Sequence, residues 1–235
     1  MKGNPAVAFL AVAQLWAGCS LAASAQQLPD PQRFEAEILR FEQQDRISPP
    51  PENAIVLTGS SSIARWNDQA KSALAPLTVI PRGFGGSVMH DVLHYLDRVA
   101  LVYKPRAILI YEGDNDIGGL PPIPKEAILG DLEKIIARIH LELPGTRIYV
   151  LSVKPSVLRW AHWPLAQQVN AGYRQIAGRD PLVHYVDVAT PLLKPDGTVR
   201  TDIFVPDNLH LNERGNAIWG ATIKAALMPT EAAAE

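Results

Sequence analysis

The sequence predicts an α/β protein in which helices cover both faces of one parallel sheet, forming a three-layer α/β/α sandwich. Short apolar runs alternate with longer stretches of helical spacing along the 235-residue chain, an order typical of parallel sheets with helical crossovers. The apolar runs are continuous, with few alternating polar residues, which indicates strands buried on both faces. A chain of this length is sufficient for one generous domain.

Five runs are predicted to be the strands of this sheet. Isoleucine and valine are common in them, and β-branched side chains favour extended backbone. In chain order the runs are residues 54–58, 77–80, 107–111, 147–151 and 183–186.

Six stretches are predicted to be helices. The first, residues 31–46, spaces apolar side chains such as Phe34, Ile38 and Phe41 at helical intervals. It ends before three consecutive prolines at 49–51, because proline cannot continue a helix. The others are residues 62–74, 87–102, 125–143, 164–177 and 212–227. The sequence contains neither an internal repeat nor a long linker, so we expect residues 26–235 to form a single domain.

Residues 1–25 are predicted to be a signal peptide that is removed. Lys2 supplies a positive start, residues 6–17 are apolar apart from Gln14, and Ala23-Ser24-Ala25 places small residues at the cleavage positions. We therefore expect an exported protein, either periplasmic or secreted.

The single cysteine of the chain, Cys19, lies inside this leader. Cleavage before Gln26 would leave no thiol for disulfides or metal ligation. Ala17-Gly18-Cys19 also resembles the end of a bacterial lipobox, so the alternative is a protein that is lipid-anchored through Cys19.

The composition excludes several classes of function. The chain has 22 basic and 24 acidic residues and a net charge of −2, whereas a dedicated nucleic-acid binder usually has a basic excess. A hydrophobic fraction of 47% is too high for a disordered chain. No apolar run reaches the roughly 20 residues of a membrane-spanning helix.

Chemically useful residues follow the first three predicted strands and precede the last helix. The strands are followed by Gly59-Ser60-Ser61-Ser62, by Arg82-Gly83-Phe84-Gly85-Gly86-Ser87 and by Gly113-Asp114-Asn115-Asp116, and the last helix is preceded by Asp207-Asn208-Leu209-His210. In open α/β sheets, ligands bind outside the carboxyl ends of the strands. We therefore expect these segments to meet at one edge.

The residue types in these segments suit acyl transfer to a serine. A serine hydroxyl needs a base, and histidine titrates near the working pH. Of the six histidines, His210 alone has a carboxylate, Asp207, three residues earlier in a loop. Such a carboxylate fixes the imidazole tautomer. Taken alone, this spacing is equally consistent with Asp207 capping a turn beside a surface histidine.

The four segments together resemble, in order and spacing, the SGNH (GDSL-type) hydrolases. The resemblance implies a flavodoxin-like sandwich with five parallel strands. It implies Ser61 as nucleophile, Asp207 as orienting acid and His210 as base. It also implies an oxyanion hole made by the backbone N–H groups of Ser61 and Gly86 and the side chain of Asn115. We expect neither a cofactor nor a metal.

The sequence departs from the family pattern at three positions. Ser60 stands where the name-giving pattern has aspartate, and Ser62 stands where it has leucine. Both hydroxyls therefore compete with Ser61 for the nucleophile role, although the Gly-x-Ser spacing favours Ser61. Pro81 replaces an asparagine that often begins the second block.

Two other patterns suggest different chemistry. His90 and His94 lie four residues apart with Asp91 between them, which resembles a zinc-binding helix, but no third ligand follows. Gly83-x-Gly85 hints at a dinucleotide fingerprint, but Val88 occupies its last glycine position. We therefore expect His90 and His94 to be partly packed helix residues without a metal, and Gly83-x-Gly85 to form a tight turn without a dinucleotide.

Substrate-binding residues are expected after the fourth strand. Lys154 or Arg159 could meet a charged group, and Trp160 could stack on a sugar ring. The alternative is a structural loop whose tryptophans close the core.

The resemblance implies a serine esterase acting on small acetyl or short-chain esters of carbohydrate or lipid. A carbohydrate O-acetylesterase, a lysophospholipase and an acyl thioesterase all fit it, and the alternative from another class is an inactive carbohydrate-binding module. The sequence leaves the oligomeric state undetermined.

Overall fold

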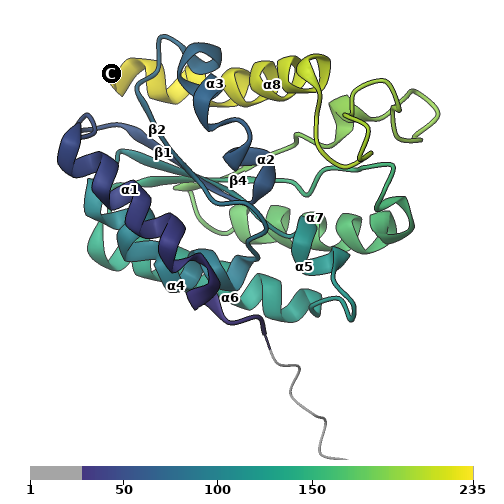
Figure 1. The fold of residues 1–235 in the computed structure, drawn as a ribbon, viewed down its shortest axis with the longest axis horizontal. Helices are drawn as coiled ribbons and strands as arrows, with labels where there is room; N and C mark the ends of the chain where they lie inside the picture. Colours follow the sequence, from purple (N-terminus) through teal and green to yellow (C-terminus); the bar gives the residue numbers. More distant parts are fainter. Residues whose placement is uncertain (1–27, 235) are drawn as a thin grey trace, which may run out of the picture.

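The computed structural model describes residues 28–234. It contains a five-stranded parallel sheet in the order β2-β1-β3-β4-β5, with helices on both faces (Figure 1). The predicted three-layer α/β/α sandwich is confirmed. The predicted signal peptide and Cys19 lie outside the described residues, so export and lipidation stay predictions.

The strands follow the predicted runs closely. The bounds are β1 Ile55–Gly59, β2 Val79–Gly83, β3 Ala107–Tyr111, β4 Arg147–Leu151 and β5 Val183–Val186. The largest difference is at β2, which was predicted to end before Pro81 and continues through it to Gly83. Because β2 is an edge strand paired with β1 alone, the missing N–H of Pro81 is tolerated there.

Eight α-helices connect and flank these strands within residues 28–234. The bounds are α1 Glu35–Ile47, α2 Ser61–Ala64, α3 Asn67–Leu74, α4 Met89–Val99, α5 Asp114–Gly118, α6 Lys125–Glu142, α7 Trp163–Ala177 and α8 Glu213–Glu231. The single helix predicted over 62–74 is therefore two helices. Trp66 N–H bonds to the Ile63 carbonyl at the break, and its buried indole packs against Gly220 of α8.

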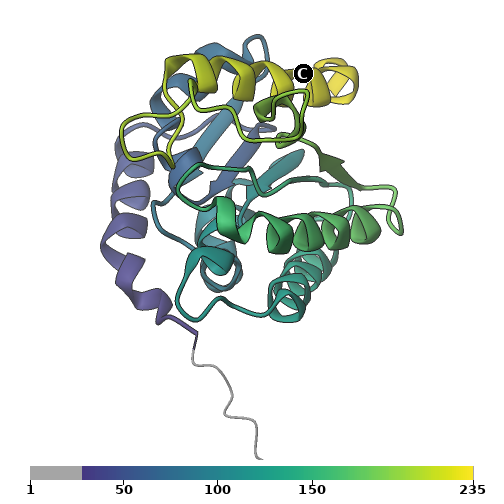
Figure 2. The same cartoon turned by 90° about the vertical axis from the view of Figure 1, so that its right-hand side faces the viewer.

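Each face of the sheet has its own hydrophobic core. Side chains alternate between the faces along a strand, so Val56 of β1 belongs to the cluster that includes α1, α4, α6 and α7, whereas its neighbour Leu57 belongs to the cluster that includes α3 and α8. Figure 2 shows the yellow α8 above the strands and the green α7 below them. Within residues 28–234, no helix combines the length and the apolar character needed to cross a bilayer.

The last turn of α8 is held at the amino ends of the strands. Glu231, which is 0% exposed, accepts hydrogen bonds from Arg147 at 2.5 and 2.8 Å, from the Tyr149 hydroxyl at 2.7 Å and from Arg106 Nε at 3.1 Å. Nearby, Asn53 Nδ2 donates to the Ala234 carbonyl at 3.2 Å. The end of the described chain therefore lies at the edge opposite the four segments singled out in the sequence.

Candidate active site

Ser61 is placed by a tight turn at the end of β1. Gly59 has φ +132, and a Cβ there would lie 2.1 Å from the Tyr111 carbonyl oxygen of β3, so this close approach requires glycine. Ser60 is extended and buried, and its N–H donates to the same oxygen at 3.1 Å. Ser61 then begins α2 at the carboxyl edge, at the switch point between β1 and β3 where such sheets bind ligands.

The hydroxyl of Ser61 meets the imidazole of His210, which is 149 residues away in the sequence. Ser61 Oγ lies 2.8 Å from His210 Nε2, and His210 Nδ1 lies 2.6 Å from Asp207 Oδ2. The three side chains therefore form one continuous hydrogen-bonded chain, the arrangement in which a serine hydroxyl can pass its proton to a base.

The loop that carries Asp207 and His210 is held by the aspartate itself. Asp207 Oδ1 accepts from the backbone N–H groups of Leu209 and His210, both at 2.9 Å, and Asn208 takes up a left-handed φ of 58. Burial disfavours the charged carboxylate, but these bonds and the His210 side chain outweigh that effect and hold the pKa of Asp207 well below its usual value. Asp207 is therefore a carboxylate wherever histidine can act as a base.

Candidate hydrogen-bond donors line the same pocket as Ser61. The N–H of Ser61 belongs to the first residue of α2 and so has no acceptor within the helix. Gly86 is exposed with φ +91 in open space, and Asn115 Nδ2 donates to the Ser87 carbonyl at 2.9 Å. Ser61, Gly86, Asn115 and His210 all line one pocket of about 510 Å³.

The neighbouring serines do not take the place of Ser61. Ser60 is 1% exposed, whereas Ser61 Oγ lies 2.8 Å from the Nε2 atom of His210. The structure therefore brings Ser61, of the three candidates, to the imidazole.

The structure corrects the expectation for Lys154. Its side chain is 0% exposed, and Nζ donates to Asp114 Oδ2 at 3.2 Å and to the Leu209 carbonyl at 2.8 Å. Because protein acceptors enclose the ammonium group, Lys154 cannot meet a charged group of a substrate.

Arg159 and Trp160 also face protein groups. Arg159 donates to Asp114 and to Asn115 Oδ1, the latter at 2.9 Å. Trp160 is stacked on Trp163 with ring centroids 6.0 Å apart and packs against the cluster around Ile203. The tryptophans thus fit the structural-loop alternative, whereas the contact of Arg159 with Asn115 was not foreseen from the sequence.

A buried acid behind the pocket was also missed. Glu112 lies within the protein, and Ser87 Oγ donates to its Oε1 at 2.5 Å. Burial, reinforced by the nearby Asp116, raises the pKa of Glu112 well above its usual value. The signal available in the sequence was a glutamate at the end of an otherwise apolar strand.

The zinc alternative finds no support in the geometry. His90 Nδ1 contacts Asp131 at 3.1 Å, while His94 is exposed and lies against the ring of Tyr95. Across residues 28–234, no group of three or more His, Cys, Asp or Glu side chains is arranged to hold a metal ion.

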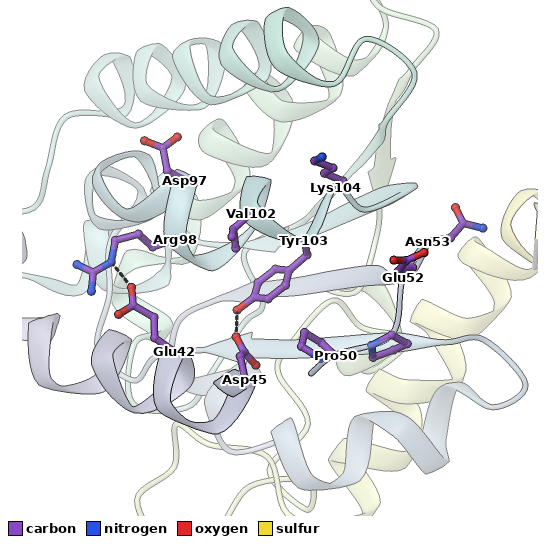
Figure 3. Close-up of a pocket in the computed structure, with 11 residues that line it drawn as sticks. Glu42, Asp45, Pro50, Glu52, Asn53, Asp97, Arg98, Val102, Tyr103 and Lys104 are labelled. Carbon is purple, nitrogen blue, oxygen red and sulfur yellow. Dashed lines mark hydrogen bonds and ion pairs between the residues drawn. The ribbon is translucent and has the colours of Figure 1, made fainter. Parts of the chain in front are cut away.

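A larger pocket, of about 800 Å³, lies at the opposite edge of the sheet (Figure 3). It is lined by residues just before β1 and β3, among them Asn53 and Lys104. Two of its carboxylates are hydrogen-bonded to other lining residues: Arg98 Nε donates to Glu42 and the Tyr103 hydroxyl donates to Asp45, both at 2.6 Å. This pocket shares no lining residue with the pocket beside Ser61.

Comparisons with known proteins agree with the geometry. A family model described as "GDSL-like Lipase/Acylhydrolase family" matches residues 49–218, whereas a search of curated proteins finds no match. Among solved structures, a protein from Streptococcus pneumonia described as a platelet activating factor is similar with a TM-score of 0.72 and 25% identity, covering 82% of this chain and 92% of that one.

Two further structures share the fold. A GDSL-like lipase from Bacteroides thetaiotaomicron superposes with a TM-score of 0.70 at 17% identity, covering 83% of this chain and 98% of that one. A catalytic mutant of an acetylxylan esterase from Geobacillus stearothermophilus gives a TM-score of 0.60 at 14% identity, with coverages of 73% and 93%.

Proposed function

Because the chain belongs to the GDSL-like lipase/acylhydrolase family, we propose that this hydrolase is a serine esterase whose nucleophile is Ser61. The observation that carries the proposal is the hydrogen-bonded chain from Ser61 Oγ through His210 to Asp207. Each group in it has the neighbour that its role requires.

In the acylation step, Ser61 Oγ attacks the ester carbonyl carbon while its proton passes to His210 Nε2. Asp207 accepts the other ring N–H and stabilises the imidazolium that forms. The tetrahedral intermediate then collapses, the carbon–oxygen bond to the alcohol breaks, and His210 delivers its proton to that leaving oxygen. Water repeats the sequence on the acyl-enzyme and releases the acid.

The negative oxygen of the intermediate is received by the oxyanion hole. We assign its donors to the N–H groups of Ser61 and Gly86 and to Asn115 Nδ2, which line the same pocket as His210. Each such donor typically contributes about 3–4 kcal/mol of transition-state stabilisation.

The substrates we propose are small acyl esters, with acetyl groups on carbohydrate as the leading candidate. The charged side chains of Glu37 and Arg65 line the pocket beside Ser61, and one structural relative is an acetylxylan esterase. A binding module without activity is disfavoured because every proposed catalytic position is occupied by a competent side chain.

Ser61→Ala tests the assignment. Hydrolysis of p-nitrophenyl acetate should fall by at least roughly 1,000-fold, because losing a nucleophile removes the acyl-enzyme route. Ser62→Ala is the matched control and should keep most of the activity, and treatment with a chelator should leave the wild-type rate unchanged. Substantial hydrolysis by Ser61→Ala would refute the proposal. A panel of acetylated sugars, lysolipids and acyl thioesters then identifies the preferred substrate.

A further inference from the structure

The guanidinium of Arg159 is fixed against the side chain of Asn115. Nη2 donates to Asn115 Oδ1 at 2.9 Å, and Nη1 donates to the Asp114 carbonyl and to Asp114 Oδ1 at 2.9 and 2.7 Å. A Cβ at Gly118 would lie 2.3 Å from Arg159 Nε. The side chain therefore passes over α5 where only a glycine leaves room.

This contact decides which way the Asn115 amide points. A guanidinium only donates hydrogen bonds, so the amide oxygen must face Arg159. The amide nitrogen is then turned away from Arg159 and donates one N–H to the Ser87 carbonyl at 2.9 Å. An amide nitrogen has two N–H groups, so Asn115, which lines the pocket beside Ser61, has a second donor besides the one used by Ser87.

The charges around Asn115 add to this effect. Arg159 and the buried Lys154 both contact Asp114. Burial disfavours ionisation of Asp114, but the two cations outweigh it and hold the pKa of Asp114 below its usual value. Of these groups, the guanidinium of Arg159 lies directly at the amide oxygen of Asn115. A cation at that oxygen draws electron density from the amide nitrogen and strengthens its N–H as a donor.

We propose that Arg159 is a positioning residue for the esterase reaction, which orients and polarises the Asn115 amide toward the oxyanion. The proposal rests on the function proposed above. Arg159 touches no reacting atom and acts through Asn115. Because the negative charge on the substrate oxygen develops only in the transition state, the benefit falls on kcat and not on substrate binding.

A double-mutant cycle with Asn115 tests this route. In p-nitrophenyl acetate hydrolysis, Arg159→Met should lower kcat roughly 10- to 100-fold with less than about a twofold change in KM. In the Asn115→Ala background, the same substitution should lower kcat less than about threefold, since the amide it acts on is gone. Arg159→Lys keeps the charge and should fall between the wild type and Arg159→Met.

Controls separate this role from a general effect on folding. Arg174 belongs to α7, and its guanidinium lies over the ring of Tyr185 in β5. Arg174→Met removes this guanidinium and should leave kcat unchanged. If Arg159→Met fails to fold, the cycle is run with Arg159→Lys. The decrease in kcat caused by Arg159→Lys must likewise disappear in the Asn115→Ala background.

Two results would overturn the proposal. The first is a loss of equal size in both backgrounds, and the second is a loss confined to KM, which would instead indicate substrate contact. If Ser61→Ala is inactive, either result leaves the esterase standing and removes only the role of Arg159. If Ser61→Ala is active, the esterase proposal and the role of Arg159 both fail.

Discussion

Glu112 shows how a single buried residue can make stability depend on pH. It sits at the end of β3 with Ser87 Oγ on its Oε1, and the carbonyl of the same Ser87 accepts from Asn115. Burial, and next the neighbouring Asp116, raises the pKa of Glu112 well above its usual value. The folded protein therefore favours the neutral form of this carboxyl group.

Glu112→Gln should change how the free energy of unfolding varies with pH. Since the folded-state pKa lies above the unfolded one, the contribution of Glu112 is complete below the ordinary carboxyl pKa and is lost as the pH rises through the raised value. The glutamine variant lacks this loss. Relative to wild type, its free energy of unfolding should increase by up to about 1.4 kcal/mol per pH unit as the pH rises above the ordinary carboxyl pKa.

Urea unfolding at pH 5 and pH 8 measures this difference. Glu126→Gln, at an exposed carboxyl group in α6, is the matched control and should track the wild type at both values. Parallel stabilities of wild type and Glu112→Gln at the two pH values would show that Glu112 ionises normally.

At the residue scale, the meeting of Ser61 with His210 and Asp207 could be predicted from the sequence. Short motifs at strand ends are local signals, and the fold brings those ends together. The contact between Arg159 and Asn115 could not be predicted in this way. It depends on where the loop after β4 crosses α5, which no local spacing encodes.

At the scale of elements, strand positions were predictable because continuous apolar runs mark buried parallel strands. The break between α2 and α3 was not. It follows from the packing of Trp66 against Gly220 of α8, a contact between segments about 150 residues apart along the chain.

Gly83 at the end of β2 fixes how closely α2 approaches the sheet. A Cβ at this position would lie 2.4 Å from the Ala64 N and 2.6 Å from the Ile63 carbonyl carbon, and backbone atoms cannot rotate away. Gly83→Ala should therefore displace α2 and destabilise the protein by about 1–3 kcal/mol. Because Ser61 begins α2, activity should also fall roughly 10- to 100-fold.

Urea unfolding and p-nitrophenyl acetate hydrolysis check both effects. Gly130→Ala in α6, where a Cβ meets nothing within 4 Å, is the control and should gain up to about 1 kcal/mol from helix propensity. If Gly83→Ala is as stable and active as wild type, the close approach does not constrain α2.

At the scale of the whole molecule, α8 runs from the carboxyl ends of the strands to their amino ends. Its first turn follows the loop that carries His210, and its last turn carries Glu231, which binds Arg147, Tyr149 and Arg106. Removing one partner from a buried ion cluster leaves the others uncompensated.

Glu231→Gln should lower the free energy of unfolding by about 2–4 kcal/mol. The kcat of the folded protein should be unchanged, because this cluster lies at the edge opposite the pocket. Denaturant unfolding, with activity measured well below the transition, separates the two effects. Glu213→Gln, an exposed glutamate of the same helix, should cost less than about 1 kcal/mol. A similar small cost at Glu231 would contradict the prediction.

The bond between Asn53 and the Ala234 carbonyl has a practical consequence. It brings the tail of α8 to the side of the molecule facing away from Ser61. A linker attached at this point would fix the enzyme to a bead or an electrode, with the pocket beside Ser61 facing the reactant solution. Bulky polymers could then approach without interference from the support.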